Sequence, residues 1–408
     1  MSKSPLSQPP SNRYHGSRRN VLVMQSGGNT PVFNSSLMGV VLEAEASNIV
    51  EEVYGALHGL GGVLSGQFVT LSGRSKSWWR HIAQTPGGAL GSSRRKFRDD
   101  DIPKIEQMLK QHNIGYWSII GGNDSAETGN RISEEALDKH WNLSVINVPK
   151  TIDNDLVLTD HCPGYGSAAR FVALATMGAG RDAEAMGVES PISVIEVMGR
   201  DAGWLAASSA LAKREERDAP HVICIPEAPV DEQQFLSRIE DAYRRFGFAV
   251  AVVAENARAR GGVLGNDKDP WYVDDFGHAY HEGAGKYLAV LAGRQFEVRV
   301  RYERPGTIQR SLAATISASD AAEAEMAGRA AVHYALEGQT GQMVTLLRQD
   351  EDEYACTTGL TPLRDVAGKV RTLPNEYFRP SDSMPSQAFI EYCTPLIGAK
   401  LPRFERIQ

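Results

Sequence analysis

The chain has 408 residues, of which 42% are hydrophobic and 23% are charged, and its formal net charge is −7 at pH 7. This length exceeds what one ordinary hydrophobic core supports, so two domains are expected, and the composition is that of a soluble globular protein. The acidic balance, without a dominant basic stripe, argues against a nucleic-acid-binding protein.

The first 18 residues contain no apolar core segment and are predicted to be a flexible leader rather than a signal peptide. No apolar run approaches the length that spans a bilayer, so no membrane association is expected. The cysteines are far apart and form no CxxC pair, a spacing that matches neither a zinc motif nor a disulfide framework. A reducing, cytoplasmic setting is therefore expected. The cysteines are Cys162, Cys224, Cys356 and Cys393.

The pattern of strand, polar or glycine loop and helix occurs three times in the first part of the chain, which predicts a parallel, doubly wound sheet. A further strand with its turn is expected within Val53–Leu64, and Trp78–Arg98 is expected to be mostly loop. The predicted strands are Val21–Met24, Tyr116–Ile120 and Val145–Val148. The predicted helices are Phe33–Ala46, Asp101–His112 and Ala126–His140.

The same pattern restarts after Gly164, which predicts a second α/β domain and a hinge near Cys162–Gly166. Strands are expected at Ile192–Val197, His221–Ile225, Phe248–Ala254 and Met343–Leu347. Helices are expected at Ser167–Met177, Trp204–Lys213, Glu232–Phe246 and Asp320–Leu336. We expect one domain over residues 19–163 plus about 309–347, a second over 164–308, and a C-terminal extension over 348–408.

The segment Lys150–Asp155 carries a cation, a hydroxyl and two carboxylates directly after a predicted buried strand. Ligands of parallel α/β sheets bind at the carboxyl ends of the strands. In extended chain Asp153 and Asp155 would point the same way, so that one could act as a base and the other could hold a metal. The alternative is a turn rich in aspartate and asparagine, which these residues favour in any protein.

Glycine pairs follow two of the predicted strands, at Gly27-Gly28 and at Gly121-Gly122, and a basic patch occupies Arg94–Lys96. Free backbone amides and arginines would suit a polyphosphate, although each glycine pair alone could merely turn the chain. In the second half, Gly199-Arg200 lies between a strand and a helix, and arginines flank Pro305–Gln309. These suit a phosphorylated acceptor, or else they form a solvated charged face. Together the motifs indicate phosphoryl transfer.

In this order, six motifs resemble those of the phosphofructokinase family, over roughly residues 20–345. The resemblance implies an α/β fold of two doubly wound domains with the active site in the cleft between them. It also implies Mg²⁺ as cofactor and fructose 6-phosphate as acceptor. The motifs are Ser26-Gly27-Gly28, Gly121–Ser125, Lys150–Asp155, Glu196–Arg200, Ile225-Pro226-Glu227 and Gly306–Ser311.

The resemblance also implies residue roles. Asp153 would accept the proton of the sugar 1-hydroxyl, with Lys150 and Arg200 completing the catalytic set. The donor would bind Gly27, Arg94, Asn123, Asp124 and Ser125, and the metal would bind Asn123, Asp124 and Asp155. The sugar phosphate would bind Thr151, Ile152, Asp153, Met198, Gly199, Arg200, Glu227, Arg301, Thr307 and Arg310. Arg301 would come from a neighbouring subunit, which implies a homodimer or homotetramer.

Two positions bear on the donor. ATP-dependent members of the family typically have glycine at the positions of Asp124 and Lys150, whereas pyrophosphate-dependent members resemble this chain. A carboxylate at Asp124 would repel a nucleotide α-phosphate, and an ammonium at Lys150 would neutralise a leaving phosphate. The sequence therefore predicts inorganic pyrophosphate as donor. Asn123 departs from the usual metal-associated aspartate and offers an oxygen without charge.

Other functions stay open at this point. The chain could be an ATP-dependent 6-phosphofructokinase, or a pyrophosphate-dependent kinase of another sugar phosphate such as sedoheptulose 7-phosphate. Outside catalysis, it could be a sugar-phosphate sensor or a regulatory subunit with the same fold. The presence of Asp153, Lys150 and Arg200 favours an enzyme.

Overall fold

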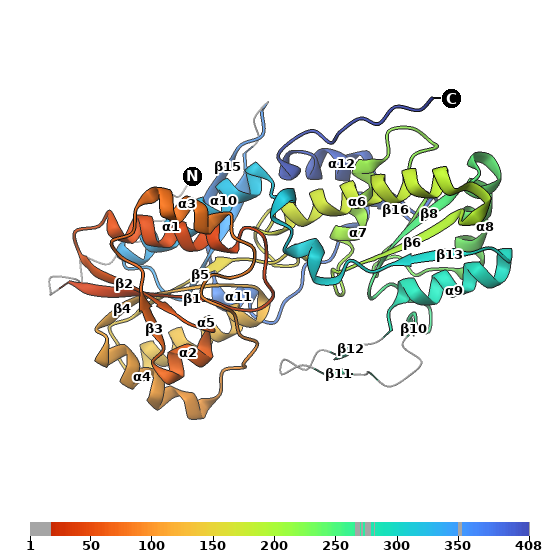
Figure 1. The fold of residues 1–408 in the computed structure, drawn as a ribbon. Coiled ribbons are helices and arrows are strands. Elements are labelled where there is room, and N and C mark those ends of the chain that lie inside the picture. The colour runs from red at the N-terminus through yellow and green to blue at the C-terminus, as the bar shows by residue number, and fades with distance from the viewer. Residues whose placement is uncertain are drawn as a thin grey trace, which may run out of the picture.

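A computed structural model describes residues 18–265, 270, 272–273, 279–280, 282–349 and 353–407. These residues form two α/β halves that lie side by side, each built on a mainly parallel sheet (Figure 1). Residues 1–17 of the predicted leader lie outside the described residues.

The first half contains a sheet whose described strands have the order β15-β14-β5-β4-β1-β2-β3. The five inner strands are parallel, and the strands at the two edges, β3 and β15, are antiparallel to their neighbours. The central strand β4 is buried along its whole length, as its nearly continuous apolar run predicts. The strands are β1 (Arg19–Gln25), β2 (Val50–Ala56), β3 (Phe68–Thr70), β4 (Ile114–Gly121), β5 (Ser144–Pro149), β14 (Gln342–Arg348) and β15 (Cys356–Pro362).

Helices cover both faces of this sheet (Figure 1). One face is covered by α1 (Phe33–Glu45), α3 (Lys76–Ala83) and α10 (Ala318–Leu336). The other is covered by α2 (Leu60–Ser65), α4 (Ile102–Gln111), α5 (Asn123–Asp138) and α11 (Leu363–Val366). Helices α1 and α10 touch backbone to backbone, because a Cβ atom at Gly39 would lie 2.1 Å from the carbonyl oxygen of Glu325.

The second half contains a sheet of parallel strands, and the order of those described is β13-β6-β8-β7. The strands are β6 (Ile192–Val197), β7 (Val222–Cys224), β8 (Ala249–Ala254) and β13 (Val300–Glu303). One face packs on α6 (Tyr165–Met186), α7 (Trp204–Ser208) and α12 (Gln387–Cys393), and the other on α8 (Glu232–Phe246) and α9 (Ala284–Phe296). Short hairpin strands are β9 (Arg258–Ala259), β10 (Gly262–Val263), β11 (Tyr272–Val273), β12 (Ala279–Tyr280), β16 (Phe378–Arg379) and β17 (Met384–Pro385).

The expected elements are present, and two of them, Ile192–Val197 and Glu232–Phe246, have the predicted ends. The prediction of loop over Trp78–Arg98 was wrong at its start, because Lys76–Ala83 is helical. The hydroxyl of Ser75 caps this helix by accepting a hydrogen bond from the backbone N–H of Trp78, 3.1 Å away. None of the helices in the described part of the chain combines the length and the apolar character needed to cross a bilayer.

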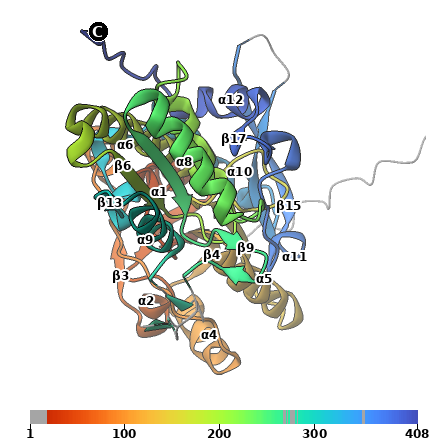
Figure 2. The same cartoon turned by 90° about the vertical axis from the view of Figure 1, so that its right-hand side faces the viewer.

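The C-terminal residues belong to both halves. Strand β15 pairs with β14 at the edge of the first sheet, whereas α12 packs into the core of the second half beside α6 and α7. Figure 2 shows α12 and β15 on the same side of the molecule. The segment predicted as an extension therefore forms part of the core.

Candidate active site

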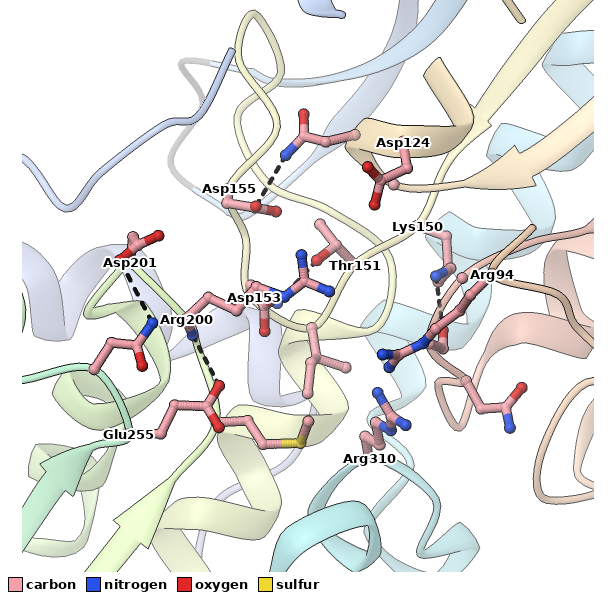
Figure 3. A pocket seen from close by; sticks show the side chains of 18 of the residues that line it. Arg94, Asp124, Lys150, Thr151, Asp153, Asp155, Arg200, Asp201, Glu255 and Arg310 are labelled. Carbon is pink, nitrogen blue, oxygen red and sulfur yellow. Dashed lines mark hydrogen bonds and ion pairs between the residues drawn. The ribbon is translucent and has the colours of Figure 1, made fainter. Parts of the chain in front are cut away.

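The carboxyl ends of the two sheets face one another across a pocket of about 400 Å³ (Figure 3). From the first half, the pocket receives the residues that follow β1, β4 and β5, and from the second half those that follow β6 and β8. Residues of the predicted site that line this pocket are Gly27, Arg94, Asn123, Asp124, Ser125, Lys150, Thr151, Ile152, Asp153, Asp155, Met198, Arg200 and Arg310. The sequence thus located most of one pocket from segments far apart in the chain.

Lys150 is buried at the end of β5, with 3% of its surface exposed. Its ammonium donates a hydrogen bond of 2.7 Å to the carbonyl oxygen of Gly28 and lies 4.9 Å from the centre of the Phe33 ring. Burial, together with the positive charge of Arg310, lowers the pKa of Lys150 to about 7. An anion bound beside Lys150 would favour its protonated, charged form. This position therefore suits an anionic ligand.

Asp153 lies opposite Arg200, whose Nε is 3.9 Å from its Oδ2 (Figure 3). The backbone N–H of Asp153 donates to the hydroxyl of Thr151 at 3.1 Å, which fixes the turn after β5. Burial and the neighbouring carboxylate of Asp155 raise the pKa of Asp153 to about 7. A carboxylate with that pKa suits a general base at neutral pH.

Asn123 begins helix α5, and its Nδ2 donates a hydrogen bond of 2.9 Å to Oδ2 of Asp155. Its Oδ1 is buried and has no hydrogen-bond partner among the described residues. Asp124 follows in the first turn of α5 and lines the same pocket. Burial raises the pKa of Asp155. These side chains offer oxygen ligands, among them Oδ1 of Asn123, which has no hydrogen-bond partner among the described residues. Such a set fits a hard divalent cation such as Mg²⁺.

The loop that follows β6 carries the residues of the second half that were predicted to bind the sugar phosphate. Arg200 has a φ of 49°, in the left-handed region, and its backbone N–H donates to Oε1 of Glu255 at 3.1 Å. Gly199, with a φ of 137°, makes this turn possible but does not line the pocket. Glu255 does line it, and sequence reasoning missed this residue. The signal was available, because Glu255 directly follows the predicted strand Phe248–Ala254.

Glu227 lies outside the pocket, although the resemblance to the family implied that it would bind the sugar phosphate. Its Oε1 accepts hydrogen bonds from the backbone N–H groups of Gly203, at 2.9 Å, and Leu373, at 2.7 Å. The carboxylate therefore connects the start of α7 to the C-terminal segment, and Glu255 is the glutamate that faces the cavity.

The arginines around Pro305 separate in space. Arg310 reaches the first glycine loop, where a Cβ atom on Gly28 would lie 2.4 Å from its Nη1. Arg301 forms an ion pair with Asp182 and lies in a different surface depression, which Ser193 and Pro305 also line. Thr307 is exposed and does not line the main pocket. Within one subunit, Arg310 lines the pocket, whereas Arg301 and Thr307 do not.

Residues 20–335 match the family described as phosphofructokinase. The chain belongs to the phosphofructokinase family. It is 38% identical over 394 residues to a pyrophosphate–fructose 6-phosphate 1-phosphotransferase of Rhodospirillum rubrum, covering 95% of this chain and 96% of that protein. A protein of the same name from Xanthomonas campestris is 35% identical over 389 residues, which are 94% of this chain and 92% of the relative.

Among solved structures, a pyrophosphate-dependent phosphofructokinase from Nitrosospira multiformis superposes with a TM-score of 0.86 at 30% identity. The match covers 96% of this chain and 95% of that chain. The prediction of a phosphofructokinase fold with two α/β halves is thereby confirmed.

Proposed function

We propose that this phosphofructokinase transfers a phosphoryl group from inorganic pyrophosphate to the 1-hydroxyl of fructose 6-phosphate, giving fructose 1,6-bisphosphate and phosphate. The observation that carries the proposal is the pairing of Lys150 and Asp124 in one pocket, beside the first glycine loop. The names of the most similar relatives support it.

The donor side explains the preference for pyrophosphate. Figure 3 shows Lys150, Arg94 and Arg310 together on one side of the pocket, with Asp124 nearby. The cations suit a compact polyanion, whereas the carboxylate of Asp124 would repel the further phosphate of a nucleotide. The bond broken is the anhydride bond of pyrophosphate, and the bond formed is a phosphate ester of similar transfer potential. The reaction should therefore run in both directions.

On the acceptor side, Asp153 would take the proton from the 1-hydroxyl as that oxygen attacks the terminal phosphorus of pyrophosphate. Arg200 would stabilise charge on the phosphoryl group in transit, and Glu255 would bind sugar hydroxyls. Mg²⁺ held by Asn123, Asp124 and Asp155 would neutralise donor charge when bound. Because little covalent chemistry is required of the protein, positioning accounts for most of the catalysis.

We further propose that the protein works in the cytoplasm as a homodimer or homotetramer. The position of Arg301 supports the oligomer, because Arg301 is a residue of β13, at the edge of the second sheet among the described strands, and lines a depression outside the pocket of its own subunit. An arginine placed there could complete the sugar-phosphate site of a neighbouring copy.

The test is a comparison of initial rates with pyrophosphate and with ATP, each with fructose 6-phosphate and Mg²⁺, followed by detection of fructose 1,6-bisphosphate. We expect turnover with pyrophosphate and little with ATP. Activity with ATP and none with pyrophosphate would overturn the donor assignment. A parallel series with sedoheptulose 7-phosphate tests the acceptor, and ligand-induced stabilisation without turnover would instead indicate a sensor.

A further inference from the structure

The C-terminal segment makes a dense set of contacts to the turn that carries the catalytic aspartates. The guanidinium of Arg371 donates to the carbonyl oxygen of Asn154 from Nε at 3.1 Å and from Nη2 at 2.8 Å. Its Nη1 donates to the carbonyls of Thr159, at 2.7 Å, and Asp160, at 2.5 Å. The backbone N–H of Arg371 also donates to the carbonyl of Asp155 at 2.7 Å. The loop from 154 to 160 is thus wrapped around one side chain.

Asn154, between the two aspartates, is fully buried and has a φ of 57°, in the left-handed region that asparagine tolerates better than most residues. Its side chain is bonded at both ends. Oδ1 accepts from the backbone N–H of Cys162 at 3.0 Å, and Nδ2 donates to the hydroxyl of Tyr392 at 2.9 Å. That hydroxyl in turn donates to the carbonyl of Asp160 at 2.9 Å. The turn is therefore fixed by α12 as well as by Arg371.

Arg371 also contacts the sugar side. Its guanidinium lies 4.5 Å from the centre of the Trp204 ring, and the indole N–H of Trp204 donates to the carbonyl of Arg371 at 3.3 Å. Trp204 begins α7, a few residues after Arg200. The same arginine is consequently attached to the turn that holds Asp153 and to the helix that follows the loop of Arg200.

We propose that Arg371, assisted by Tyr392, is a positioning residue that sets the spacing of Asp153, Asp155 and Arg200. Neither Arg371 nor Tyr392 lines the pocket, so neither touches substrate there. Arg371 acts through the backbone carbonyl of Asn154, which lies between the two carboxylates, and through the carbonyls of Asp155, Thr159 and Asp160 that follow it. A planar guanidinium satisfies the three carbonyls at once, whereas the single ammonium of lysine cannot reproduce that fork. The inference rests on the proposed function in taking Asp153, Asp155 and Arg200 as the reacting set.

The test compares Arg371→Lys and Tyr392→Phe with wild type and with Arg379→Lys, a conservative control on the exposed part of the same segment. We expect Arg371→Lys to lower kcat by roughly 10- to 100-fold, because small misplacements of reacting groups have effects of that size. The KM for fructose 6-phosphate should change much less.

A second measurement does not depend on the donor. Hydrogen exchange in the free protein should be faster for amides of residues 153–162 in Arg371→Lys than in wild type, with exchange in β4 and β8 unchanged. Added guanidinium at millimolar concentration should restore part of the turnover of Arg371→Ala, whereas sodium at equal ionic strength should not.

If wild type fails to use pyrophosphate, the proposed function fails alone, and these comparisons proceed with the donor that it does use. Unchanged kcat and unchanged exchange in Arg371→Lys would overturn the inference, as would faster exchange across the whole protein.

Discussion

The ammonium of Lys150 and the carbonyl oxygen of Gly28 are joined by a hydrogen bond of 2.7 Å, although 122 positions separate them in the chain. This contact ties the end of β5 to the glycine loop after β1. It places the cation on which the proposed donor preference rests next to the loop that would receive the donor.

Lys150→Met should remove this charge while keeping the volume of the side chain. We expect kcat/KM for pyrophosphate to fall by about 10²–10³-fold, the usual effect of losing one preorganised charge-stabilising donor. The KM for fructose 6-phosphate should stay close to that of wild type. Initial-rate kinetics measure both, with Lys139→Met on the exposed end of α5 as the control. Full activity of Lys150→Met would remove this residue from the donor site.

Asp153→Asn should remove the proton acceptor with little change in shape. Turnover should fall by at least about 10²–10⁴-fold, the range for a general base. Binding of fructose 6-phosphate, measured by calorimetry, should survive, because the amide still fills the space beside Arg200. A variant that keeps the wild-type rate would show that another group accepts the proton.

The pH dependence of the free enzyme follows from two shifted pKa values. Asp153 must be deprotonated to act as a base, and burial raises its pKa to about 7, so activity should rise as the pH increases through that value. Lys150 must be protonated, and burial lowers its pKa to about 7, so activity should fall above it. The profile of kcat/KM should therefore be a narrow bell near neutrality, with limbs that belong to the coupled site. In Lys150→Arg the alkaline limb should move to higher pH, because the guanidinium stays charged. A flat profile from about pH 6 to 8 would contradict this assignment.

Glu255→Gln tests the glutamate that faces the cavity. We expect kcat/KM for fructose 6-phosphate to fall by about 10- to 100-fold, as for the loss of a hydrogen bond to a charged group. Glu227→Gln is the informative comparison, since that side chain bonds Gly203 and Leu373 rather than the pocket. It should lower the melting temperature more than it changes the KM. The reverse pattern would return the sugar-binding role to Glu227.

Arg301 offers a test of assembly. If it completes the site of a neighbouring subunit, Arg301→Ala and Asp153→Asn should each be nearly inactive alone. Mixed subunits, formed by coexpression of the two variants, should regain measurable activity because some sites then receive both intact residues. Size-exclusion chromatography with light scattering gives the oligomeric state of each sample. A fully active monomer of wild type would refute the shared site.

Sequence reasoning located the pocket because most of the residues that line it follow predicted parallel strands, whose carboxyl ends meet. It could not separate Glu227 from Glu255, since both follow strands and only the packed structure shows that Leu373 occupies the carboxylate of Glu227. It also missed helix α3, which occupies the start of the segment Trp78–Arg98 that was expected to be mostly loop. The contacts of Arg371 to the loop from 154 to 160 were beyond reach, because they join segments more than two hundred positions apart and have no local pattern.

Strand β15 and helix α12 have a consequence for how the protein is made. The sheet that begins at Arg19 gains its last edge only when residues 356–362 are added, and the core beneath α6 includes Leu396 and Leu401. Domains commonly fold one after another as they leave the ribosome. Here a nascent chain that has reached Leu336 contains neither half in full, so both halves wait for the segment from β15 to Leu401 to be added.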